Sequence, residues 1–474
     1  MKSSSLGSLA SSGIRRVALS ALVAILMLMT SISVQAAAPT VQFSSPQNLS
    51  NSNAPASMDD PHAIATSGSH VYVTWRGKMN GAQGTLFAAS ADNGTTWGPT
   101  MDLSNGTGTA SLQKISADGS NVYAVWIGKS LGVNLVYLRA SHDYGVTFGP
   151  TVKISDFLSI EPKMASCDGG VYVSWVNSTV RAQGMPGPQT MFFRASQDNG
   201  TTWGPIINLQ ANDPNPTAKG NEEEVECSGP NVYVIYSDYT LGPRNVFVRV
   251  SHDRGVTFSP FVDISKVGAS GNIREPVISV SGNYAYVYYI YRTSSKSNYQ
   301  AFVSASNDSG TTWGAPMNVC NDMYNCHEPF MASSGPNAYV VLHEFTATAQ
   351  TALYFIVSHD GGKTWSAKLN LIPGETSKSS FGAITASGSW VFITWSDKQT
   401  SNNWQEKFVA SNDNGTTFGP THDLSNDTGN AGLITYDHQD RAISSSSNFV
   451  YVLWLDTTTA SGNPNLFFIA GQFA

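Results

Sequence analysis

Short segments in which β-branched and aromatic residues alternate, with no polar face, recur along the whole chain. Two of them read VYVTW from Val71 and VYVSW from Val171. Such segments are typical of β-strands that are buried on both faces between neighbouring sheets. The eight segments begin at Val71, Val122, Val171, Val232, Ala285, Ala338, Val391 and Val450. The pattern therefore predicts an all-β chain made of eight similar sheets.

Each alternating segment is accompanied by three further predicted strands. A segment of the form Pro-x-Ile-Ala-x-x-Gly precedes it, as in Pro61 to Gly68, and one such as FFRAS, Phe192 to Ser196, follows it. The fourth starts at Gly-Pro and runs to Leu-Ser, as in Gly98 to Ser104. Proline is tolerated there because an outer strand has a free edge. We expect four strands in each unit.

A polar motif, Ser-x-Asp-x-Gly-x-Thr-aromatic, follows the third strand of seven units. Its copies begin at Ser90, Ser141, Ser196, Ser251, Ser306, Ser358 and Ser411, so neighbouring copies start 51 to 55 residues apart. A period near fifty residues predicts stacked supersecondary units. Within the motif the Asp can accept backbone N–H bonds, the Gly supplies a positive φ, and the aromatic residue covers the turn. We expect a self-contained turn at a hairpin tip.

This motif resembles the Asp box, or bacterial neuraminidase repeat, of sialidases and related β-propellers. The resemblance covers nearly all of the chain after its N-terminal segment, and it implies a β-propeller of the sialidase-like superfamily. It also implies that the boxes lie on the blade periphery, away from substrate. A structural role is therefore expected for Asp92, Asp143, Asp198, Asp253, Asp308, Asp360 and Asp413.

The last unit, Asp440 to Ala474, supplies three strands and no box. The segment VQFSSPQNLS, Val41 to Ser50, has the pattern of the missing outer strand. We therefore predict that this N-terminal strand completes the last blade and closes the ring, which leaves no open edge between the first and last units. The prediction is eight four-stranded blades; seven is the alternative, if one unit is absorbed elsewhere.

The N-terminal segment has the features of a secretory signal. Lys2, Arg15 and Arg16 precede an apolar run, Val17 to Val34, and a small-residue cleavage site ends at Ala36. We predict a signal peptide over 1–36 and one propeller domain over 37–474, in a protein that is secreted or held at the cell surface. The apolar run is long enough to cross a bilayer, so an uncleaved anchor is the alternative and the one membrane contact expected.

Charge and cysteine content limit the kinds of partner and the cellular compartment that we expect for this protein. Charged residues make up 12% of the chain and the net charge is −7, which disfavours nucleic acid as a partner. Four cysteines fit an oxidising compartment. We predict a disulfide between Cys320 and Cys326, which share one loop. Cys167 and Cys227 each stand two residues before a Gly, so we expect side chains that point the same way around the ring and two buried thiols.

Acidic residues recur seven residues before the Gly that ends each predicted inner strand, with a one-residue allowance in some units. The residues are Asp60, Glu161, Glu222, Glu275, Glu328 and Asp440. We expect them near the mouth of the central channel, on the face where propellers usually bind ligands. Carboxylates this close must be paired or protonated. The favoured interpretation is hydrogen bonds to the neighbouring blade, with no metal and no cofactor. The alternative is a cation site, with Ca²⁺ as the ion considered.

Arginines and aromatic residues are expected on the same face. Arg76 and Arg292 follow alternating strands, Arg274 and Arg441 stand on inner strands, and Trp404 suits stacking on a sugar ring. Guanidinium groups recognise carboxylates bidentately. The predicted ligand-binding residues are Asp60, Arg76, Glu161, Glu222, Arg274, Glu275, Glu328, Trp404, Asp440 and Arg441.

The resemblance to sialidases implies an arginine triad, a Tyr–Glu nucleophile pair and an Asp acid/base. The candidates here are Arg76, Arg274 and Arg441 with Glu275 and Tyr291. Two features depart from that family: sialidases have six blades, and the Phe-Arg-Ile-Pro signature expected on the first inner strand is replaced by DDPHAIA. The favoured function is thus a module that binds a glycan or an extracellular protein. The alternatives are an exo-α-sialidase-like glycoside hydrolase and a structural cell-envelope protein.

Overall fold

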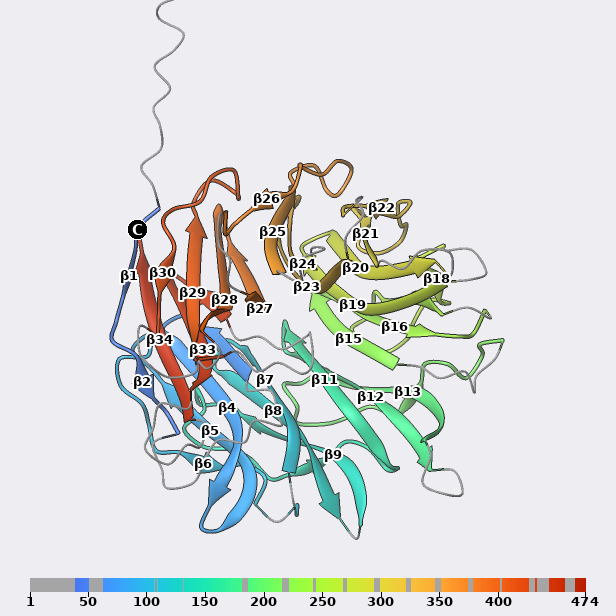
Figure 1. The fold of residues 1–474 in the computed structure, drawn as a ribbon. Coiled ribbons are helices and arrows are strands. Elements are labelled where there is room, and N and C mark those ends of the chain that lie inside the picture. The colour runs from blue at the N-terminus through green and yellow to red at the C-terminus, as the bar shows by residue number, and fades with distance from the viewer. Residues whose placement is uncertain are drawn as a thin grey trace, which may run out of the picture. The chain divides into compact units, whose positions relative to one another are not determined.

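A computed structural model provides the structure of the protein (Figure 1). It describes 39–474 apart from 51–62, 106, 109, 131, 181–185, 215–220, 242–243, 267–270, 294–298, 321–324, 346–350, 374–377, 401–402, 426–430, 433–442 and 457–464. The chain divides into two units, Met1–Ala38 and Pro39–Ala474. The predicted signal peptide lies outside the described residues. Within them, no helix is long and apolar enough to cross a membrane.

Seven sheets consist of four strands that follow one another in the chain, from the inner strand outward. Blades 1 to 3 are β3 (Ala63–Ser67), β4 (His70–Met79), β5 (Ala82–Ser90) and β6 (Met101–Asp102); β7 (Ala110–Asp118), β8 (Asn121–Ser130), β9 (Val133–Ser141) and β10 (Val152–Lys153); and β11 (Ser159–Cys167), β12 (Gly170–Val180), β13 (Pro186–Ser196) and β14 (Ile207–Asn208). Blades 4 and 5 are β15 (Asn221–Ser228), β16 (Asn231–Asp238), β17 (Asn245–Ser251) and β18 (Val262–Asp263); and β19 (Gly271–Ser281), β20 (Tyr284–Thr293), β21 (Gln300–Ser306) and β22 (Met317–Asn318). Blades 6 and 7 are β23 (Asn325–Ser334), β24 (Asn337–Phe345), β25 (Thr351–Ser358) and β26 (Leu369–Asn370); and β27 (Lys378–Ser387), β28 (Trp390–Thr400), β29 (Asn403–Ser411) and β30 (His422–Asp423).

The eighth sheet joins the two ends of the propeller unit. Its middle strands are β33 (Phe449–Asp456) and β34 (Asn465–Phe473), its inner edge is β31 (Ala431–Gly432) and β32 (Ile443–Ser446), and its outer edge is β1 (Val41–Phe43) and β2 (Gln47–Asn48). Each edge is divided into two short strands, so this sheet has six strands in the arrangement of a four-stranded blade. Successive inner strands are neighbours, and β32 returns to β3. The prediction of eight blades is confirmed, and the seven-blade alternative is wrong.

The N-terminal strand closes the ring as predicted. Val41 is opposite Phe473 and Gln47 is opposite Phe468, both antiparallel, and Figure 1 shows β1 beside β34. The backbone N–H of Ser44 donates to the carbonyl of Ala470 at 2.8 Å. A Cβ on Gly471 would lie 2.6 Å from the side chains of Val41 and Phe43, so glycine is needed where the two strands meet.

The core consists of eight apolar clusters, each formed by adjoining blades. The alternating strands are buried on both faces: Val71, Tyr72 and Val73 are all 0% exposed. Tyr72 packs toward blade 2 with Phe87, whereas Val71 and Val73 pack toward blade 8. Burying both faces of a sheet requires a neighbour on each side, and only a closed ring supplies one to every blade.

Each Asp box satisfies its polar groups within its own turn. In the second box, Asp143 Oδ1 accepts bonds from the Ser141 hydroxyl at 2.7 Å and the Thr147 N–H at 2.9 Å, and Oδ2 accepts from the Thr147 hydroxyl at 2.6 Å. These bonds, led by that of the Thr147 hydroxyl, lower the pKa of Asp143 to about 2. The other six boxes repeat the bonds between the Asp, the preceding Ser and the following Thr.

The boxes also contact the preceding blade, which the sequence did not reveal. A Cβ on Gly145 of the second box would lie 2.8 Å from Phe87 in blade 1. Asn199 of the third box accepts a bond from the Tyr123 hydroxyl of blade 2 at 3.4 Å. At blade 8, which has no box, Phe473 packs 4.8 Å from Trp390 of blade 7. The outer turns thus hold neighbouring blades together.

The prediction that Cys167 and Cys227 are separate thiols is wrong: they form a disulfide between blades 3 and 4. Their equal distance from a Gly hid a difference in register. Cys167 is opposite Gly170, one place beyond the residue opposite Val171, whereas Cys227 is directly opposite Val232, the equivalent of Val171. Because side chains alternate along a strand, the two cysteines point toward each other across adjacent inner strands.

Ring closure predicts the effect of Phe43→Ala. The Phe43 ring lies edge-on to Phe408 of blade 7, with 5.0 Å between centroids, and its truncation should cost about 2 kcal/mol of unfolding free energy. Thermal denaturation followed by circular dichroism should show a midpoint lowered by a few degrees. Ser45→Ala, at an exposed position in the same segment, is the control. Equal midpoints for the two variants would contradict a stabilising role for the N-terminal strand.

Candidate functional site

The recurring acidic position coincides with a β-bulge in the inner strands. The ladder with the second strand skips two residues in six blades, and the first skipped residue is Leu112, Glu161, Glu222, Glu275, Glu328 or Phe381. Glu161 and Glu275 have φ values of 51° and 56°, in a region that non-glycine residues seldom adopt. Bulges redirect side chains and occur often beside functional sites. The Glu-Pro pattern in the sequence therefore marks a backbone irregularity that is repeated around the channel.

Not all of the predicted carboxylates can be located. Asp60, Asp440 and Arg441 lie outside the described residues, and for Glu222 and Glu328 the structure describes the backbone alone. Glu161 on blade 3 and Glu275 on blade 5 are half-buried. A convergence of six carboxylates at the channel mouth therefore stays a prediction.

A second set of carboxylates, just after the alternating strands, is buried inside the blades. Asp238, Glu344, Asp397 and Asp456 are 0%, 1%, 3% and 1% exposed. Asp238 accepts bonds from Gln210 Nε2 and from the N–H of Thr240, and burial raises its pKa. Glu344 is paired with Lys368 at 3.0 Å. Asp238 thus joins the end of blade 3, through Gln210, to Thr240 of its own blade, and Glu344 is paired within blade 6. These partners favour a structural role.

The start of blade 5 gathers cationic and aromatic side chains, which we call the blade 5 cluster: Arg274, Arg292, Tyr299 and His327. The guanidinium carbons of Arg274 and Arg292 lie 5.7 and 4.8 Å from the centre of the Tyr299 ring. His327, from blade 6, meets the same ring edge-on at 5.2 Å. Arg274 is exposed, Arg292 is half-buried and Tyr299 is 6% exposed. The buried ring therefore supports two permanent positive charges close together.

The backbone explains this arrangement. Arg274 immediately precedes the bulge at Glu275 on β19, and Arg292 is opposite Asn272 near the end of β20. Tyr299 directly precedes β21. Tyr291, a predicted catalytic candidate, is opposite Ile273 and packs edge-on to Phe302 at 6.0 Å. Arg274, Glu275 and Tyr291 thus belong to one blade, whereas the sequence had left their proximity open.

The remaining predicted site residues lie on other blades. Arg76 is on β4 of blade 1, and its Nε is 2.6 Å from the side-chain amide of Gln83, which accepts when its oxygen faces the guanidinium. Blades 1 and 5 are on opposite sides of a ring of eight, so a site shared by Arg76 and Arg274 would have to span the central channel and stays a prediction. Trp404 is half-buried on blade 7, with Lys398 Nζ 5.5 Å from the centre of its ring.

Polar inner-strand residues line the central channel. Two cavities, of about 200 and 340 Å³, are bounded by inner strands. Hydroxyl pairs join neighbouring blades across the wall, including Ser116 with Ser166 at 2.6 Å and Ser279 with Ser333 at 2.8 Å. Glu226 lines both cavities. Glu226 is opposite the tyrosine of the alternating strand in blade 4. The equivalent position is occupied by Ser116 in blade 2 and by Ser279 in blade 5.

Potential metal ligands come together once within the part of the chain that the structure describes. One sulfur each of Cys320 and Cys326 and a carboxylate oxygen of Glu344 lie within 4.8 Å of one another. However, the two sulfurs are bonded to each other in a disulfide, the pairing predicted from their shared loop. The group therefore provides no thiolate ligand for a metal while that bond is intact.

Sequence reasoning missed one strongly perturbed carboxyl. Glu406, on β29, is 0% exposed, and burial raises its pKa to about 8. The hydroxyls of Thr394 and Ser396 donate to it from β28. A perturbed carboxyl can mark an active site when it faces a cleft. Glu406 instead lies between two strands of one blade, so a structural role fits its surroundings. In the sequence its polar neighbours alternate with apolar residues, and this pattern did not indicate a buried carboxyl.

Comparison with known proteins identifies one of the repeats. The BNR/Asp-box repeat model matches residues 356–367. Among solved structures, the chain is similar to Hadza microbial sialidase Hz136, with 14% identity over 71% of this chain and 73% of that chain and a TM-score of 0.38. It is also similar to Trypanosoma rangeli sialidase in complex with sialic acid (13% identity, 68% of this chain, 55% of that chain, TM-score 0.38) and to the polysaccharide lyase Uly1 (8% identity, 88% and 90%, TM-score 0.49). No curated protein matches the chain. All three TM-scores are below 0.5, so no conclusion is drawn from these likenesses.

The raised pKa of Glu406 predicts a pH-dependent stability. The folded state keeps this proton up to about pH 8, whereas the unfolded chain releases it near the ordinary value of 4.5. The stability that it contributes is therefore complete below pH 4.5 and is lost as the pH rises to 8. Glu406→Gln carries no such proton, so relative to the wild type it should gain on the order of 4 kcal/mol across this window.

Thermal denaturation at several pH values between 5 and 8 tests this prediction. The difference in midpoint between Glu406→Gln and the wild type should grow with pH in favour of the variant. Asp156→Asn removes a carboxylate whose side chain is 55% exposed and should leave the wild-type pH course unchanged. A Glu406→Gln variant that follows the wild-type course would show that Glu406 is ionised in the folded protein.

Proposed function

We propose that this chain, a sialidase-like β-propeller built from Asp-box repeats, is a secreted or surface-held module that binds an acidic glycan through the blade 5 cluster. The observation that carries the proposal is the position of two guanidinium groups, those of Arg274 and Arg292, against the one ring of Tyr299. Guanidinium forks bind carboxylate and sulfate groups through paired hydrogen bonds. A ligand with such a group and a sugar ring fits this chemistry.

The overall charge makes this cluster distinctive. The chain carries a net charge of −7, which disfavours an anionic ligand overall, and two neighbouring arginines provide positive charge locally. Tyr299 fixes the guanidinium groups before a ligand arrives, which reduces the entropy lost on binding. The two disulfides support a site outside the cytoplasm, because such bonds persist in oxidising compartments.

The alternative is sialidase-like hydrolysis, which would use three arginines around one carboxylate. Of the suggested triad, Arg76 on blade 1 and Arg274 on blade 5 are separated by the channel. Arg76 Nε lies 2.6 Å from the Gln83 amide of its own blade, and this local partner favours binding without turnover. Turnover of a fluorogenic sialoside that is lost in Arg274→Ala would reverse this preference.

A panel of sugars tests the binding proposal. N-acetylneuraminic acid, glucuronic acid and a sulfated hexosamine should bind the full propeller in isothermal titration calorimetry, whereas glucose should not. Arg274→Ala and Arg292→Ala should each weaken binding at least about tenfold, equivalent to ~1.4 kcal/mol. Added salt should weaken wild-type binding as well.

Arg139→Ala is the matched control, because it removes the same charge from β9, where Arg139 donates to Thr151 within blade 2 at 2.9 Å. It should retain wild-type affinity. An equal loss in Arg139→Ala would assign the effect to net charge rather than to the cluster. Absence of binding across the acidic sugars would refute the proposal and favour a protein partner or a structural role in the cell envelope.

A further inference from the structure

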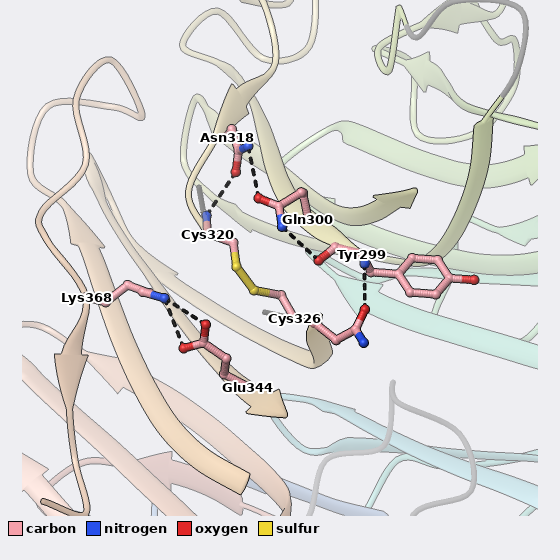
Figure 2. The surroundings of a disulfide bond; sticks show 8 residues. Tyr299, Gln300, Asn318, Cys320, Cys326, Glu344 and Lys368 are labelled. Atoms are coloured by element: carbon pink, nitrogen blue, oxygen red, sulfur yellow. Dashed lines mark hydrogen bonds and ion pairs between the residues drawn. A yellow bond between two sulfur atoms is a disulfide. The ribbon is translucent and has the colours of Figure 1, made fainter. Parts of the chain in front are cut away.

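The loop closed by Cys320 and Cys326 holds Tyr299 from two directions (Figure 2). The backbone N–H of Cys326 donates to the carbonyl of Tyr299 at 3.2 Å. The backbone N–H of Tyr299 in turn donates to the side-chain oxygen of Asn325 at 2.8 Å. Both polar backbone groups of Tyr299 are therefore bound by residues at the C-terminal end of the disulfide loop.

The other end of the loop reaches Tyr299 through two amide side chains, as Figure 2 shows. Asn318 Oδ1 accepts from the backbone N–H of Cys320 at 3.1 Å, and its Nδ2 donates to Gln300 Oε1 at 3.4 Å. Gln300 Nε2 donates to the carbonyl of Tyr299 at 3.2 Å. The disulfide and these hydrogen bonds thus form a closed ring of contacts that includes Tyr299, the residue against which Arg274 and Arg292 pack.

The disulfide is buried at the boundary between blades 5 and 6, where it joins the residues after β22 to β23. Cys320 and Cys326 are 4% and 0% exposed. Cys326 is opposite Glu344 in the β23–β24 ladder, and Lys368 binds both carboxylate oxygens of Glu344 at 3.0 and 3.1 Å. Lys368 Nζ also lies 4.7 Å from the centre of the Tyr354 ring. An ion pair therefore lies beside the buried sulfur atoms.

We propose that the Cys320–Cys326 disulfide is a positioning element for the blade 5 cluster: it fixes Tyr299 beneath Arg274 and Arg292, so that ligand affinity depends on the intact bond. This inference rests on the proposed function. A dithiol reductant would supply two electrons and two protons, the S–S bond would give two thiols, and the dithiol would become a disulfide. Cys320, and with it the Asn318–Gln300 link to Tyr299, is then no longer tied to Cys326 in the β23–β24 ladder. Tyr299 loses one of its two restraints, and the two guanidinium groups lose their fixed support.

The two disulfides of the protein allow a matched comparison. Cys320 and Cys326 are separated by 6 residues, Cys167 and Cys227 by 60. The longer loop restrains the unfolded chain more, so its bond is expected to contribute more to global stability. Cys167 and Cys227 lie at the opposite end of the inner strands, next to the turns into β12 and β16. A positioning role and a general stabilising role therefore predict opposite orders of effect.

Affinity for N-acetylneuraminic acid and glucuronic acid is the first measurement. Cys320→Ala/Cys326→Ala should lose at least fivefold, whereas Cys167→Ala/Cys227→Ala should lose less than twofold although its denaturation midpoint falls further. Asn325→Ala keeps both disulfides and removes the acceptor for the Tyr299 N–H, so it should reproduce the loss. Equal affinities in the wild type and in the Cys320/Cys326 variant would overturn the proposal.

Amide hydrogen exchange without ligand is the second measurement. The Tyr299 amide should exchange at least tenfold faster in Cys320→Ala/Cys326→Ala and at the wild-type rate in Cys167→Ala/Cys227→Ala. An unchanged Tyr299 rate in the first variant overturns the positioning role whatever the affinities. Fast Tyr299 exchange in that variant, with a wild type that binds none of the acidic sugars, supports the positioning of Tyr299 and refutes the proposed function instead.

Discussion

The burial of both faces of every blade is the constraint on which the rest of the structure depends. Each alternating strand, such as Val71 to Val73, is fully covered, so no blade is stable in isolation and the ring must close. Closure is achieved with β1 and β2 on the outer edge of blade 8. With the sheets fixed in this way, the residues at the starts of the inner strands can differ from blade to blade, and that is where Arg274 and the Cys320–Cys326 loop are found.

The sequence predicted the repeated strands and turns and the disulfide within one loop, and it missed contacts between residues far apart in the chain. The alternating segments, the boxes and the Val41 to Ser50 strand share a period, so eight blades and their closure followed from the pattern. The Cys167–Cys227 bond did not, because Cys167 is the last paired residue before its turn whereas Cys227 is the last but one. The blade 5 cluster joins residues from three strands of one blade and one of the next, and no local spacing signals such a meeting. Glu406 was missed because its burial depends on neighbours that the pattern does not identify.

Charged side chains in the boxes and in the blade 5 cluster are used in two different ways. In the boxes, a carboxylate such as Asp143 is satisfied by its own Ser and Thr, so it serves the turn and its pKa is lowered. In the blade 5 cluster, the guanidinium groups of Arg274 and Arg292 lie against a ring face. A cation–π contact does not use the N–H donors of a guanidinium group, so they remain available for hydrogen bonds. This difference in how polar atoms are used separates scaffold from candidate site more clearly than residue type does.

The contact between each box and the blade before it affects how such a chain can change length in evolution. Gly145 fits against Phe87, and Asn199 accepts from Tyr123, so every unit carries on its own outer turn the half of the joint that matches its predecessor. A tandem duplication of one unit would thus introduce a complete pair of complementary surfaces. The exception is the final unit, where Phe473 and the N-terminal strand replace the box. Changes in ring size are therefore expected from insertions among the internal units, with the terminal junction inherited intact.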